Sequence, residues 1–476
     1  MELHPLWKGF TYFQHQIDGI KWMLEKEVVG SYVPNSDYSL MVHVRGGFQC
    51  DDMGLGKTIQ IVGVMVNNIV KTTLIIAPLA MVQTWSELCQ RVGMAVYEIE
   101  NSKWTYKNPA NAGIPRRFMK NRPAVYISNY DKMHHHISMF QRDWDRIVLD
   151  EAHVIRNGDT YISSLSRNIH ATIRWVVTGT PLVNSYADIV SLMAFLGVPY
   201  SRLWKWEARY LQILPHLLIH RSLDLLRSTI ENAPPVPEIN HIVLPFTTEE
   251  EEDFYFGIQG ATEELLAKYS RDALNSGETF KLLLRLRQIS VHPQVFINAK
   301  RREDKRYHRS DWSLPCTKFE KIREIIETDT DDHRYLIFCQ FHDEMEYLHD
   351  FLIEEGIVEN VLMYNGSLNQ KQRTEVLRQS KESTEKTVML LQLQAGGVGL
   401  NLQEYDRIIF ISPWWTSAMM DQAVARAVRM GQTRVVKVFY LQLVAEKDNS
   451  INIDKLINQT ADRKRELLKN IYAICV

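Results

Sequence analysis

Gln49-Cys50-Asp51-Asp52-Met53-Gly54-Leu55-Gly56-Lys57-Thr58 is the segment of this chain whose chemistry is easiest to recognise. Its glycines let backbone N–H groups approach an oxyanion, its lysine suits the β- and γ-phosphates of a nucleotide, and its threonine hydroxyl suits Mg²⁺. The apolar run at 59–66 predicts a helix whose N-terminus completes the anion site. The strict G-x-x-x-x-G-K-T pattern is missed, because Asp51 occupies the position of its first glycine.

A second motif lies far downstream, where the apolar run 147–149 leads into Asp150-Glu151-Ala152-His153. An apolar strand that ends in an acidic pair is what a metal–nucleotide site requires. Alone, G-L-G-K-T could be an ordinary strand-to-helix turn. The two motifs together predict a nucleotide site.

The composition is that of an ordinary globular protein, with 45% hydrophobic and 24% charged residues in 476. This length predicts roughly two to four domains, each able to bury its own core. The formal net charge is only −2, so any affinity for nucleic acid has to come from a local basic stripe.

Cysteine usage and hydropathy indicate the compartment. The five cysteines are scattered without a C-x-x-C pair, which argues against a zinc finger or a disulfide framework and for a reducing environment. No apolar run approaches the ~20 residues that cross a bilayer, and residues 1–10 do not resemble a signal peptide. We expect an intracellular protein, nuclear if eukaryotic and otherwise cytoplasmic or viral, with no membrane partner.

Short apolar runs alternate with helical or loop segments after Thr58, which is typical of a parallel sheet covered on both faces. The expected strands of this first series are 73–76, 124–128, 147–149 and 174–178. Because ligands bind at the carboxyl ends of such strands, the segments 51–58, 150–153 and 178–181 are expected to meet at one edge.

A second alternating series predicts a second parallel-sheet lobe, so the expected fold class is α/β. Its strands are expected at 335–338, 361–364, 388–391, 407–411 and 435–440. Between the two series lie a stiff Pro-rich segment, with Pro234, Pro235 and Pro237, and a helical region.

The second lobe has no phosphate loop, but it carries Gln422, Arg426 and Arg429 at i, i+4 and i+7 of a predicted helix. No acidic residue lies between 422 and 432, which disfavours an exposed salt-bridging helix. Two guanidinium groups aimed at a triphosphate held by the other lobe would stabilise transition-state charge and tie hydrolysis to cleft closure.

Other segments leave alternatives open. The basic stretch 103–122 is either a solvated insertion or a phosphate contact, and 300–309 is a DNA-facing patch, a nuclear-import signal or a solvated loop. His134-His135-His136 is expected at the surface. Gln16, in a helix predicted around 15–22, is a candidate for reading an adenine edge.

Taken together, these residues resemble the SWI/SNF-related family of superfamily-two ATP-dependent DNA translocases and helicases over most of the chain. The motifs that carry the resemblance stand in the family's order at 15–22, 51–58, 77–85, 150–157, 178–184, 284–293, 338–340, 395–402, 413–415 and 422–432. The family accepts an acidic residue at the position of Asp51. The segments 149–157 and 395–402 are most similar to the DNA-repair branch, although this chain has too few cysteines for the RING finger of some members.

The resemblance implies two RecA-like lobes in tandem with a helical protrusion. The domains it implies are an ATP-binding lobe at 1–233, a Pro-rich linker at 234–245, a helical protrusion at 246–312, a C-terminal lobe at 313–446 and a bracing segment at 447–476.

The resemblance also implies ATP and Mg²⁺ as cofactors. Lys57 would bind phosphates, Thr58 and Asp150 would bind the metal, Glu151 would polarise the attacking water, and Arg426 and Arg429 would act as arginine fingers. Other residues implied at the nucleotide are Gln16 on adenine, Asp52, Met53, Gly54, Leu55, Gly56, His153, Gly399 and Gln422. Residues implied at double-stranded DNA, with single-stranded DNA as second candidate, are Pro78, Trp85, Gln340, Gly396, Gly397 and Trp415.

Several positions depart from the family pattern, namely Asn365, Gln392, Gln394, Ser412, Thr416-Ser417 and Val428. None of them removes a catalytic group. We therefore expect an ATP-driven motor, acting as a monomer, that moves along duplex DNA and remodels DNA or protein–DNA complexes. The alternatives are a strand-separating helicase and a catalytically weak nucleic-acid-binding scaffold.

Overall fold

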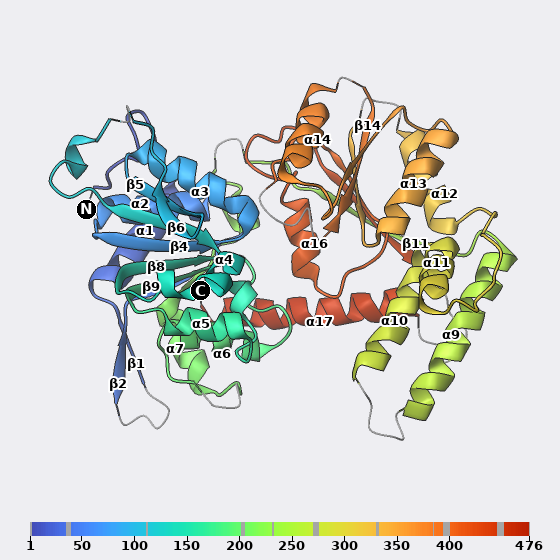
Figure 1. The fold of residues 1–476 in the computed structure, drawn as a ribbon, viewed down its shortest axis with the longest axis horizontal. Helices are drawn as coiled ribbons and strands as arrows, with labels where there is room; N and C mark the ends of the chain where they lie inside the picture. The colour runs from blue at the N-terminus through green and yellow to red at the C-terminus, as the bar shows by residue number, and fades with distance from the viewer. Residues whose placement is uncertain are drawn as a thin grey trace. The chain divides into compact units, whose positions relative to one another are not determined.

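The computed structural model describes residues 2–34, 40–110, 113–200, 205–230, 233–269, 276–329, 333–383, 385–393, 400–444 and 452–475. Its contacts divide the chain into two compact units, each with its own sheet (Figure 1). Unit 1 comprises Met1–Ala233 together with Lys464–Val476, and unit 2 comprises Pro234–Arg463.

The described residues of unit 1 form an eight-stranded sheet in the order β10-β3-β9-β8-β4-β7-β5-β6. Neighbouring strands are parallel except for β5 and β6. The strands are β3 (Gly46–Gln49), β4 (Thr72–Ala77), β5 (Ala95–Glu100), β6 (Lys103–Tyr106), β7 (Ala124–Asn129), β8 (Trp144–Asp150), β9 (Ala171–Val177) and β10 (Leu218–Ile219). A separate antiparallel hairpin, drawn in blue in Figure 1, consists of β1 (Ser31–Pro34) and β2 (Met41–Val44).

The two faces of this sheet bury different apolar cores, because successive strand residues point to opposite sides. Ile75 and Val148 belong to a core shared with α1–α3, whereas Ile76 and Leu149 belong to a core shared with α4–α7. The helices of unit 1 are α1 (Gln14–Val28), α2 (Lys57–Asn67), α3 (Leu79–Val92), α4 (Tyr130–His135), α5 (Tyr161–Asn168), α6 (Tyr186–Phe195), α7 (Arg209–Leu217), α8 (Leu223–Leu226) and the 3₁₀ turns η1 (Arg116–Phe118), η2 (Ile137–Met139) and η3 (Ala152–Ile155).

A buried ion pair lies inside the core shared with α1–α3. Arg146 of β8 and Glu27 of α1 are 1% and 0% exposed, and the arginine Nε donates to Glu27 Oε1 at 2.6 Å. The indole Nε1 of Trp175 donates to the same oxygen at 2.8 Å. A buried charge requires hydrogen-bonded partners of this kind. The three side chains therefore connect α1 to the neighbouring strands β8 and β9.

Unit 2 contains, in its described part, a six-stranded parallel sheet in the order β11-β16-β15-β12-β14-β13. Its strands are β11 (Glu238–Leu244), β12 (Tyr335–Cys339), β13 (Asn360–Tyr364), β14 (Thr387–Gln392), β15 (Arg407–Phe410) and β16 (Lys437–Leu443). Phe338, Phe410, Tyr440 and His241 stack across four adjacent strands with ring centroids 4.9, 5.0 and 5.1 Å apart.

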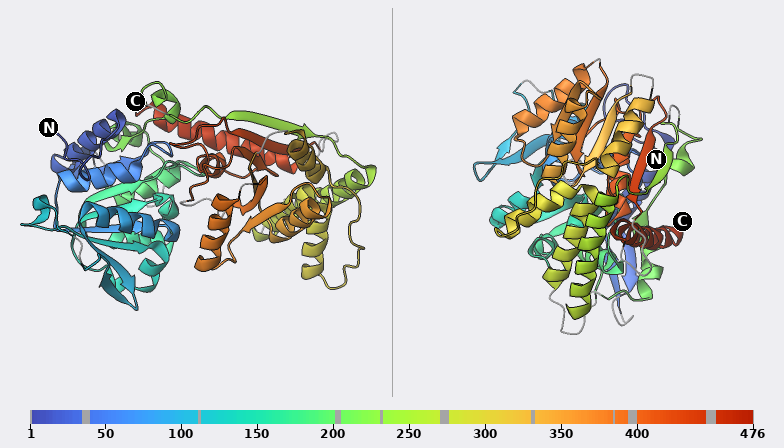
Figure 2. Two further views of the ribbon diagram at one scale, coloured as in Figure 1. Left: turned by 90° about the horizontal axis from the view of Figure 1, so that it is seen from above. Right: turned by 90° about the vertical axis from the view of Figure 1, so that its right-hand side faces the viewer.

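Helices again cover both faces of this sheet, and α9, α10 and α11 form the predicted protrusion. Figure 2 shows α9 and α10 packed side by side. The helices of unit 2 are α9 (Glu249–Tyr269), α10 (Ser276–Val291), α11 (Pro293–Glu303), α12 (Thr317–Thr328), α13 (His342–Glu354), α14 (Gln370–Glu382) and α16 (Ser417–Val424). Helix α17 (Ile453–Ala473) begins in unit 2, and its residues from Lys464 onward belong to unit 1.

The predicted α/β class with two parallel-sheet lobes and a helical protrusion is confirmed. All nine strands expected from apolar runs are present, as β4, β7, β8, β9 and β12–β16. Strands β1, β2, β3, β5, β6 and β10 were not predicted from the sequence. The sequence analysis was wrong about residues 238–244, which were expected in a linker but form β11, paired with β16 along its length.

No helix in the described ranges is both long and apolar enough to cross a bilayer.

Candidate functional site

Three neighbouring strands of unit 1 end at the same edge of the sheet. The register places Gln49 of β3 and Asp150 of β8 on either side of Val177 of β9. The backbone N–H of Thr178 donates to Gln49 O at 3.1 Å. The loop 50–56, the pair Asp150-Glu151 and the turn 178–180 therefore meet where the sequence predicted a ligand site.

The loop after β3 turns into α2 through two glycines in the left-handed region, Gly54 (φ 87°) and Gly56 (φ 77°). A Cβ at position 56 would be strained by this positive φ, and it would lie 2.6 Å from the Nε2 of Gln16, whose side chain would have to move. Gly56 caps α2 without a side chain, and Thr58 lies half-buried in the first turn. The first N–H groups of α2 thus remain available for an anion.

Lys57 points back into this loop. Its Nζ donates to the carbonyl oxygens of Asp51 at 2.8 Å and Asp52 at 3.3 Å. A Cβ on Gly179 would lie 3.5 Å from the same Nζ, so this ammonium group lies beside the turn after β9. Backbone carbonyls are weaker partners for a cation than phosphate oxygens, so a bound phosphate would displace them.

Asp51, the residue in place of a glycine, is fully buried and anchors the loop. Arg221 Nε donates to its Oδ1 at 2.9 Å, and Arg221 Nη2 donates to its Oδ2. The amides of Gln49 and Gln60 each donate to Oδ2 at 2.9 Å. Charge-assisted bonds of this kind fix the backbone of the loop at Asp51, where the glycine of the strict motif would leave it more conformational freedom.

Arg221 also contacts the segment that precedes the loop in sequence. Its Nη1 donates to the carbonyl of His15, and its Nη2 donates to Gln60 Oε1 at 2.8 Å. Burial lowers the pKa of the His15 imidazole below its ordinary value, so this ring is neutral near pH 7. One guanidinium therefore links α1, the phosphate loop and α2.

Asp52 receives a second set of contacts, which reaches the end of α17. His220 Nε2 lies 3.3 Å from Asp52 Oδ1, and the N–H of Leu223 donates to Oδ2 at 2.9 Å. Burial alone would raise the pKa of Asp52, but these two hydrogen bonds hold it below its ordinary value. The ring of Tyr472 stacks on His220 with centroids 3.5 Å apart, and its hydroxyl donates to Gly179 O at 2.9 Å.

The structure brings Gln16 against the phosphate loop, as a nucleotide contact requires. Its side chain is buried and already bonded, with Oε1 accepting from Phe13 N at 3.2 Å and Nε2 donating to Leu55 O at 3.5 Å. An adenine edge would have to exchange with these contacts.

Asp150 is buried at the end of β8, and three donors surround it. Trp85 Nε1 donates to its Oδ2 at 2.7 Å, Glu151 N donates to its Oδ1 at 3.0 Å, and the Tyr130 hydroxyl donates to its carbonyl at 2.8 Å. Burial, together with the adjacent Glu151 charge, raises the pKa of Asp150 to about 6. The expectation that the Trp85 side chain contacts DNA is wrong, because the indole is 0% exposed and bonded to this carboxylate.

Glu151 occupies the left-handed region (φ 48°, ψ 47°), which is unusual for a residue with a Cβ. Such strain is concentrated at functional sites because the surrounding structure must enforce it. His153 Nδ1 lies 3.3 Å from Glu151 Oε2 and 3.4 Å from the Thr178 hydroxyl. The acidic pair thus has one carboxylate held by hydrogen bonds at the end of β8 and one that lies beside His153 of η3.

The Asp150 carboxylate and the Thr58 hydroxyl are hard oxygen donors of the kind that Mg²⁺ takes in nucleotide sites. The described residues contain no group of three or more His, Cys, Asp or Glu side chains that could hold a metal ion. That is compatible with Mg²⁺, which is usually bound by one or two protein oxygens, substrate phosphates and water.

In unit 2, the arginine-bearing segment is not one continuous helix. Helix α16 ends at Val424, and the N–H of Arg426 donates to Ala423 in a tighter turn. The Arg426 carbonyl accepts from Leu402 N at 3.1 Å, which takes it out of the helical ladder. The prediction that Gln422, Arg426 and Arg429 share one face of a helix is therefore wrong. Gln422 alone lies on α16, where it is buried.

Both arginines lie at the carboxyl end of this segment, beyond α16. Arg429 Nη1 donates to Leu400 O at 3.4 Å, and burial lowers the pKa of its guanidinium, which remains charged. Arg426 is half-buried.

The residues expected at DNA differ in their surroundings. Pro78 precedes the exposed first turn of α3, where Leu79 is 65% exposed. Gln340 uses its amide within unit 2, accepting from Arg287 and donating to Pro413 O at 3.0 Å. Trp415 is half-buried against the core of unit 2. Gly396, Gly397 and Gly399 lie outside the described residues.

One departure from the family pattern has a structural explanation. Ser412 stands where an acidic residue is usual, and its hydroxyl accepts from Lys318 Nζ at 2.9 Å. Asp454 of α17 supplies the carboxylate instead, 2.8 Å from the same buried ammonium group. The positive charge is therefore neutralised without an acid at position 412.

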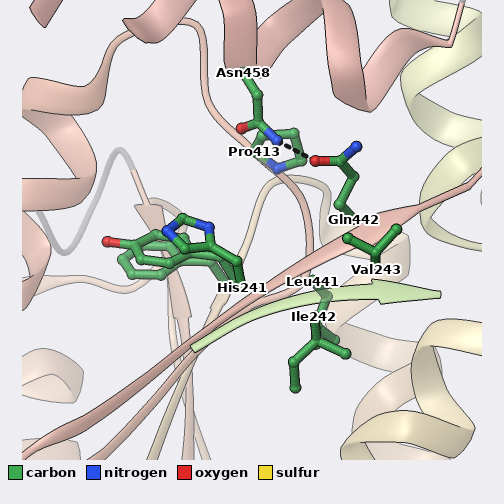
Figure 3. A pocket seen from close by; sticks show the side chains of 9 residues that line it. His241, Ile242, Val243, Pro413, Leu441, Gln442 and Asn458 are labelled. Atoms are coloured by element: carbon green, nitrogen blue, oxygen red, sulfur yellow. Dashed lines mark hydrogen bonds between the residues drawn. The ribbon is translucent and has the colours of Figure 1, made fainter. Parts of the chain in front are cut away.

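Figure 3 shows a hollow at the edge of the unit 2 sheet, with the amide of Asn458 donating to Gln442 at 2.7 Å. The hollow has a volume of about 20 Å³, which is room for a single water molecule. It is lined by His241, Ile242, Val243, Phe410, Pro413, Tyr440, Leu441, Gln442 and Asn458. No residue predicted to bind nucleotide or DNA lines it.

Sequence reasoning missed the residues that support the phosphate loop, above all Arg221, His220 and Tyr472. One signal was available for Arg221. An aspartate at a buried loop position requires a cation nearby, and Arg221 follows an apolar stretch at 217–219 that could have been read as a strand. No local pattern connects Tyr472 to a loop formed more than 400 residues earlier.

The chain matches two protein-family models. The model of the SNF2-related domain matches residues 15–295, and the helicase conserved C-terminal domain matches 317–431. A "Probable global transactivator" of Orgyia pseudotsugata multicapsid polyhedrosis virus is 26% identical over 96% of this chain and 91% of its own length. The DNA repair protein RAD5B of Arabidopsis thaliana is 23% identical over 98% of this chain, which spans only 48% of that protein.

Among solved structures, the Sulfolobus solfataricus SWI2/SNF2 ATPase core in complex with dsDNA aligns with a TM-score of 0.41 at 22% identity, covering 99% of this chain and 95% of that one. The matched SNF2-related domain extends over more than half of the present sequence. This chain belongs to the SNF2-related family of helicase-like ATPases.

Proposed function

We propose that this protein hydrolyses ATP with Mg²⁺ at the edge of the unit 1 sheet and uses the energy to move along double-stranded DNA. The observation that carries this proposal is the meeting of Lys57, Asp150 and Glu151 at the ends of β3 and β8, beside the turn after β9. Family membership supports the use of ATP.

The residues would divide the chemistry as follows. Lys57 and the first N–H groups of α2 would bind the phosphates, and Asp150 with Thr58 would hold Mg²⁺, which when bound neutralises phosphate charge. Glu151 would orient the attacking water and accept its proton. Arg426 and Arg429 would stabilise the charge that develops on the transferred phosphoryl group.

Around these groups, the remaining loop residues have supporting roles. Gly54 and Gly56 give the backbone the turn that lets N–H groups face an anion. Asp52 and Met53 would shape the loop before this turn, and Leu55 lies between the two glycines. Gln16 and His153 would contact the nucleotide at its two ends. Gln422 and Gly399 would contribute from unit 2.

Contacts with DNA are proposed mainly to phosphates, so binding would tolerate any sequence. Pro78, Gln340 and Trp415 are the described candidates, and Gly396 and Gly397 complete the set. Remodelling of DNA or of protein–DNA complexes would follow from movement along the duplex.

The decisive experiment is steady-state ATP hydrolysis with no nucleic acid, single-stranded DNA, duplex DNA and duplex RNA. We expect duplex DNA to stimulate turnover most strongly, and a triplex-displacement assay to show movement along it. Stimulation chiefly by single strands, together with strand displacement, would replace translocation by a strand-separating helicase. Absence of any hydrolysis would favour a nucleic-acid-binding scaffold.

The assignment of the general base has a separate test. Substituting Glu151→Gln is expected to reduce turnover by about 10²-fold or more while ATP still binds, because proton transfer is lost and the site's shape is retained. Asp131→Asn, an exposed change in the first turn of α4, serves as the matched acid-to-amide control. Hydrolysis by Glu151→Gln at the wild-type rate would refute the site assignment.

A further inference from the structure

The indole of Trp85 is a buried donor to a carboxylate of the nucleotide site. Its side chain is 0% exposed on α3, and its Nε1 lies 2.7 Å from Asp150 Oδ2. A donor–acceptor distance this short is typical of a hydrogen bond to a charged acceptor. The bond joins α3 to the end of β8.

The other acceptors of Asp150 are also held. The N–H of Glu151 donates to Oδ1 at 3.0 Å, and the Tyr130 hydroxyl donates to the backbone carbonyl at 2.8 Å. Each carboxylate oxygen has more than one lone pair, so both can still face a cation. Rotation of the carboxylate, however, would break the bond with Trp85.

The same helix begins at an exposed surface. Leu79 is 65% exposed, and Ala80, Gln83 and Thr84 are exposed, whereas Trp85 is buried less than two turns later. The rise from residue 79 to residue 85 is only about 9 Å at 1.5 Å per residue. A packed α-helix moves as a rigid element over such a length, so a displacement of its first turn is transmitted to the indole.

We infer that Trp85 is a positioning residue that sets the orientation of the Asp150 carboxylate and thereby couples contact at the start of α3 to metal binding and ATP turnover. This inference rests on the proposed function and adds a route for its regulation. Nucleic acid bound at Pro78 and Leu79 would shift α3, and Trp85 would adjust the metal-binding carboxylate. The indole itself does not touch nucleotide or DNA.

The chain provides a matched control. Trp175 is also 0% exposed in unit 1, and its Nε1 donates to a buried carboxylate, Glu27 Oε1, at 2.8 Å. Trp85→Phe and Trp175→Phe each remove one indole N–H from a buried carboxylate and keep an aromatic ring. Only the first carboxylate belongs to the nucleotide site.

Two readouts are measured on the full chain. The first is binding of a fluorescent, non-hydrolysable ATP analogue as a function of Mg²⁺ concentration, and the second is ATP hydrolysis with and without duplex DNA. Trp85→Phe is expected to raise the Mg²⁺ concentration for half-maximal binding by about tenfold and to reduce the ratio of DNA-stimulated to basal turnover severalfold. Trp175→Phe is expected to change neither quantity.

Equal changes in the two variants, or no change in Trp85→Phe, would overturn the inference and leave Trp85 a packing residue. If Trp85→Phe does not fold, Leu79→Ala, an exposed change in the first turn of α3, tests the coupling from its other end. An unchanged ratio of DNA-stimulated to basal turnover in that variant would overturn the inference. A wild-type protein without ATP hydrolysis would instead refute the proposed function, so the two failures are distinguishable.

Discussion

At the scale of single residues, the departure from the strict phosphate-loop pattern at Asp51 is a structural substitution. A glycine would give the loop freedom, whereas the buried aspartate gives it a fixed anchor on Arg221, Gln49 and Gln60. The loop conformation is thus determined by side chains that lie on β3, on α2 and after β10.

Removing the guanidinium group of Arg221 should strongly lower the stability of the protein. Arg221→Ala leaves the Asp51 charge buried without its partner, so we expect the free energy of unfolding to fall by about 3–5 kcal/mol and ATP binding to weaken. Urea unfolding and nucleotide titration measure the two effects.

Arg378→Ala on α14 is the control, because Arg378 and its ion-pair partners Glu375 and Glu382 are all exposed. Its loss should change the free energy of unfolding little, because exposed ion pairs contribute little to stability. Similar effects for the two arginines would show that Asp51 does not depend on Arg221.

At the scale of secondary-structure elements, the N-terminus of α13 contains a buried acid. Glu344 is 0% exposed and accepts from the N–H groups of Gln340 at 2.7 Å and Phe341 at 2.9 Å. Burial raises the pKa of its carboxyl to about 7, against which these hydrogen bonds act only in part.

This raised pKa makes a prediction for stability against pH. Between the ordinary value of about 4.5 and about 7, the folded chain holds a proton that the unfolded chain has lost, so stability contributed by Glu344 is lost as pH rises through 7. Glu344→Gln cannot titrate. Its free energy of unfolding, measured by urea at about pH 5 and pH 8, should therefore fall less than that of the wild type over this range.

Helix α17 makes a second element-scale prediction. Tyr472→Phe removes the donor to Gly179 O and should lower the free energy of unfolding by about 1 kcal/mol. Tyr472→Ala also removes the stacking on His220, so it should raise the KM for ATP as well. Lys469→Ala, an exposed change on the same helix, should leave KM unaltered; a KM shift in that control would mean that α17 acts in another way.

Comparison of sequence with structure shows which physical signals are local. Nine strands were predictable because each contains a short run of mostly apolar residues. Strand β3 was not, because it begins with Gly46-Gly47, and glycines usually weaken a strand. Here they allow close approach, since a Cβ on Gly46 would lie 1.9 Å from Arg174 O.

The residues proposed for the nucleotide site could be selected from the sequence because Lys57, Thr58, Asp150 and Glu151 stand in short contiguous motifs. The position of Trp85 was not, since an indole on a helix does not reveal whether it faces solvent or a carboxylate. Helix α16 ends at Val424, and just beyond it the Arg426 carbonyl accepts a hydrogen bond from Leu402 N. No local sequence pattern predicts this bond between distant segments.

At the scale of the whole molecule, the net charge of −2 means that attraction to DNA has to come from a local group of basic side chains. If the protein contacts about six phosphates, the logarithm of its binding constant should fall with the logarithm of salt concentration at a slope of about −5. Fluorescence anisotropy with two unrelated duplex sequences measures this slope, and the two sequences should agree. A slope near zero, or a strong sequence preference, would contradict phosphate-dominated binding.

The membership of α17 in both units has a consequence for biosynthesis. One core of unit 1 includes Ile471, which is 1% exposed, with Leu467, Leu468 and Tyr472 packed against it. The lobe that leaves the ribosome first therefore lacks part of its interior until the segment near Ile471 has been made. At about 5–20 residues per second, the wait after Ala233 is on the order of 10–50 s, during which the apolar face that this segment covers is open to chaperones.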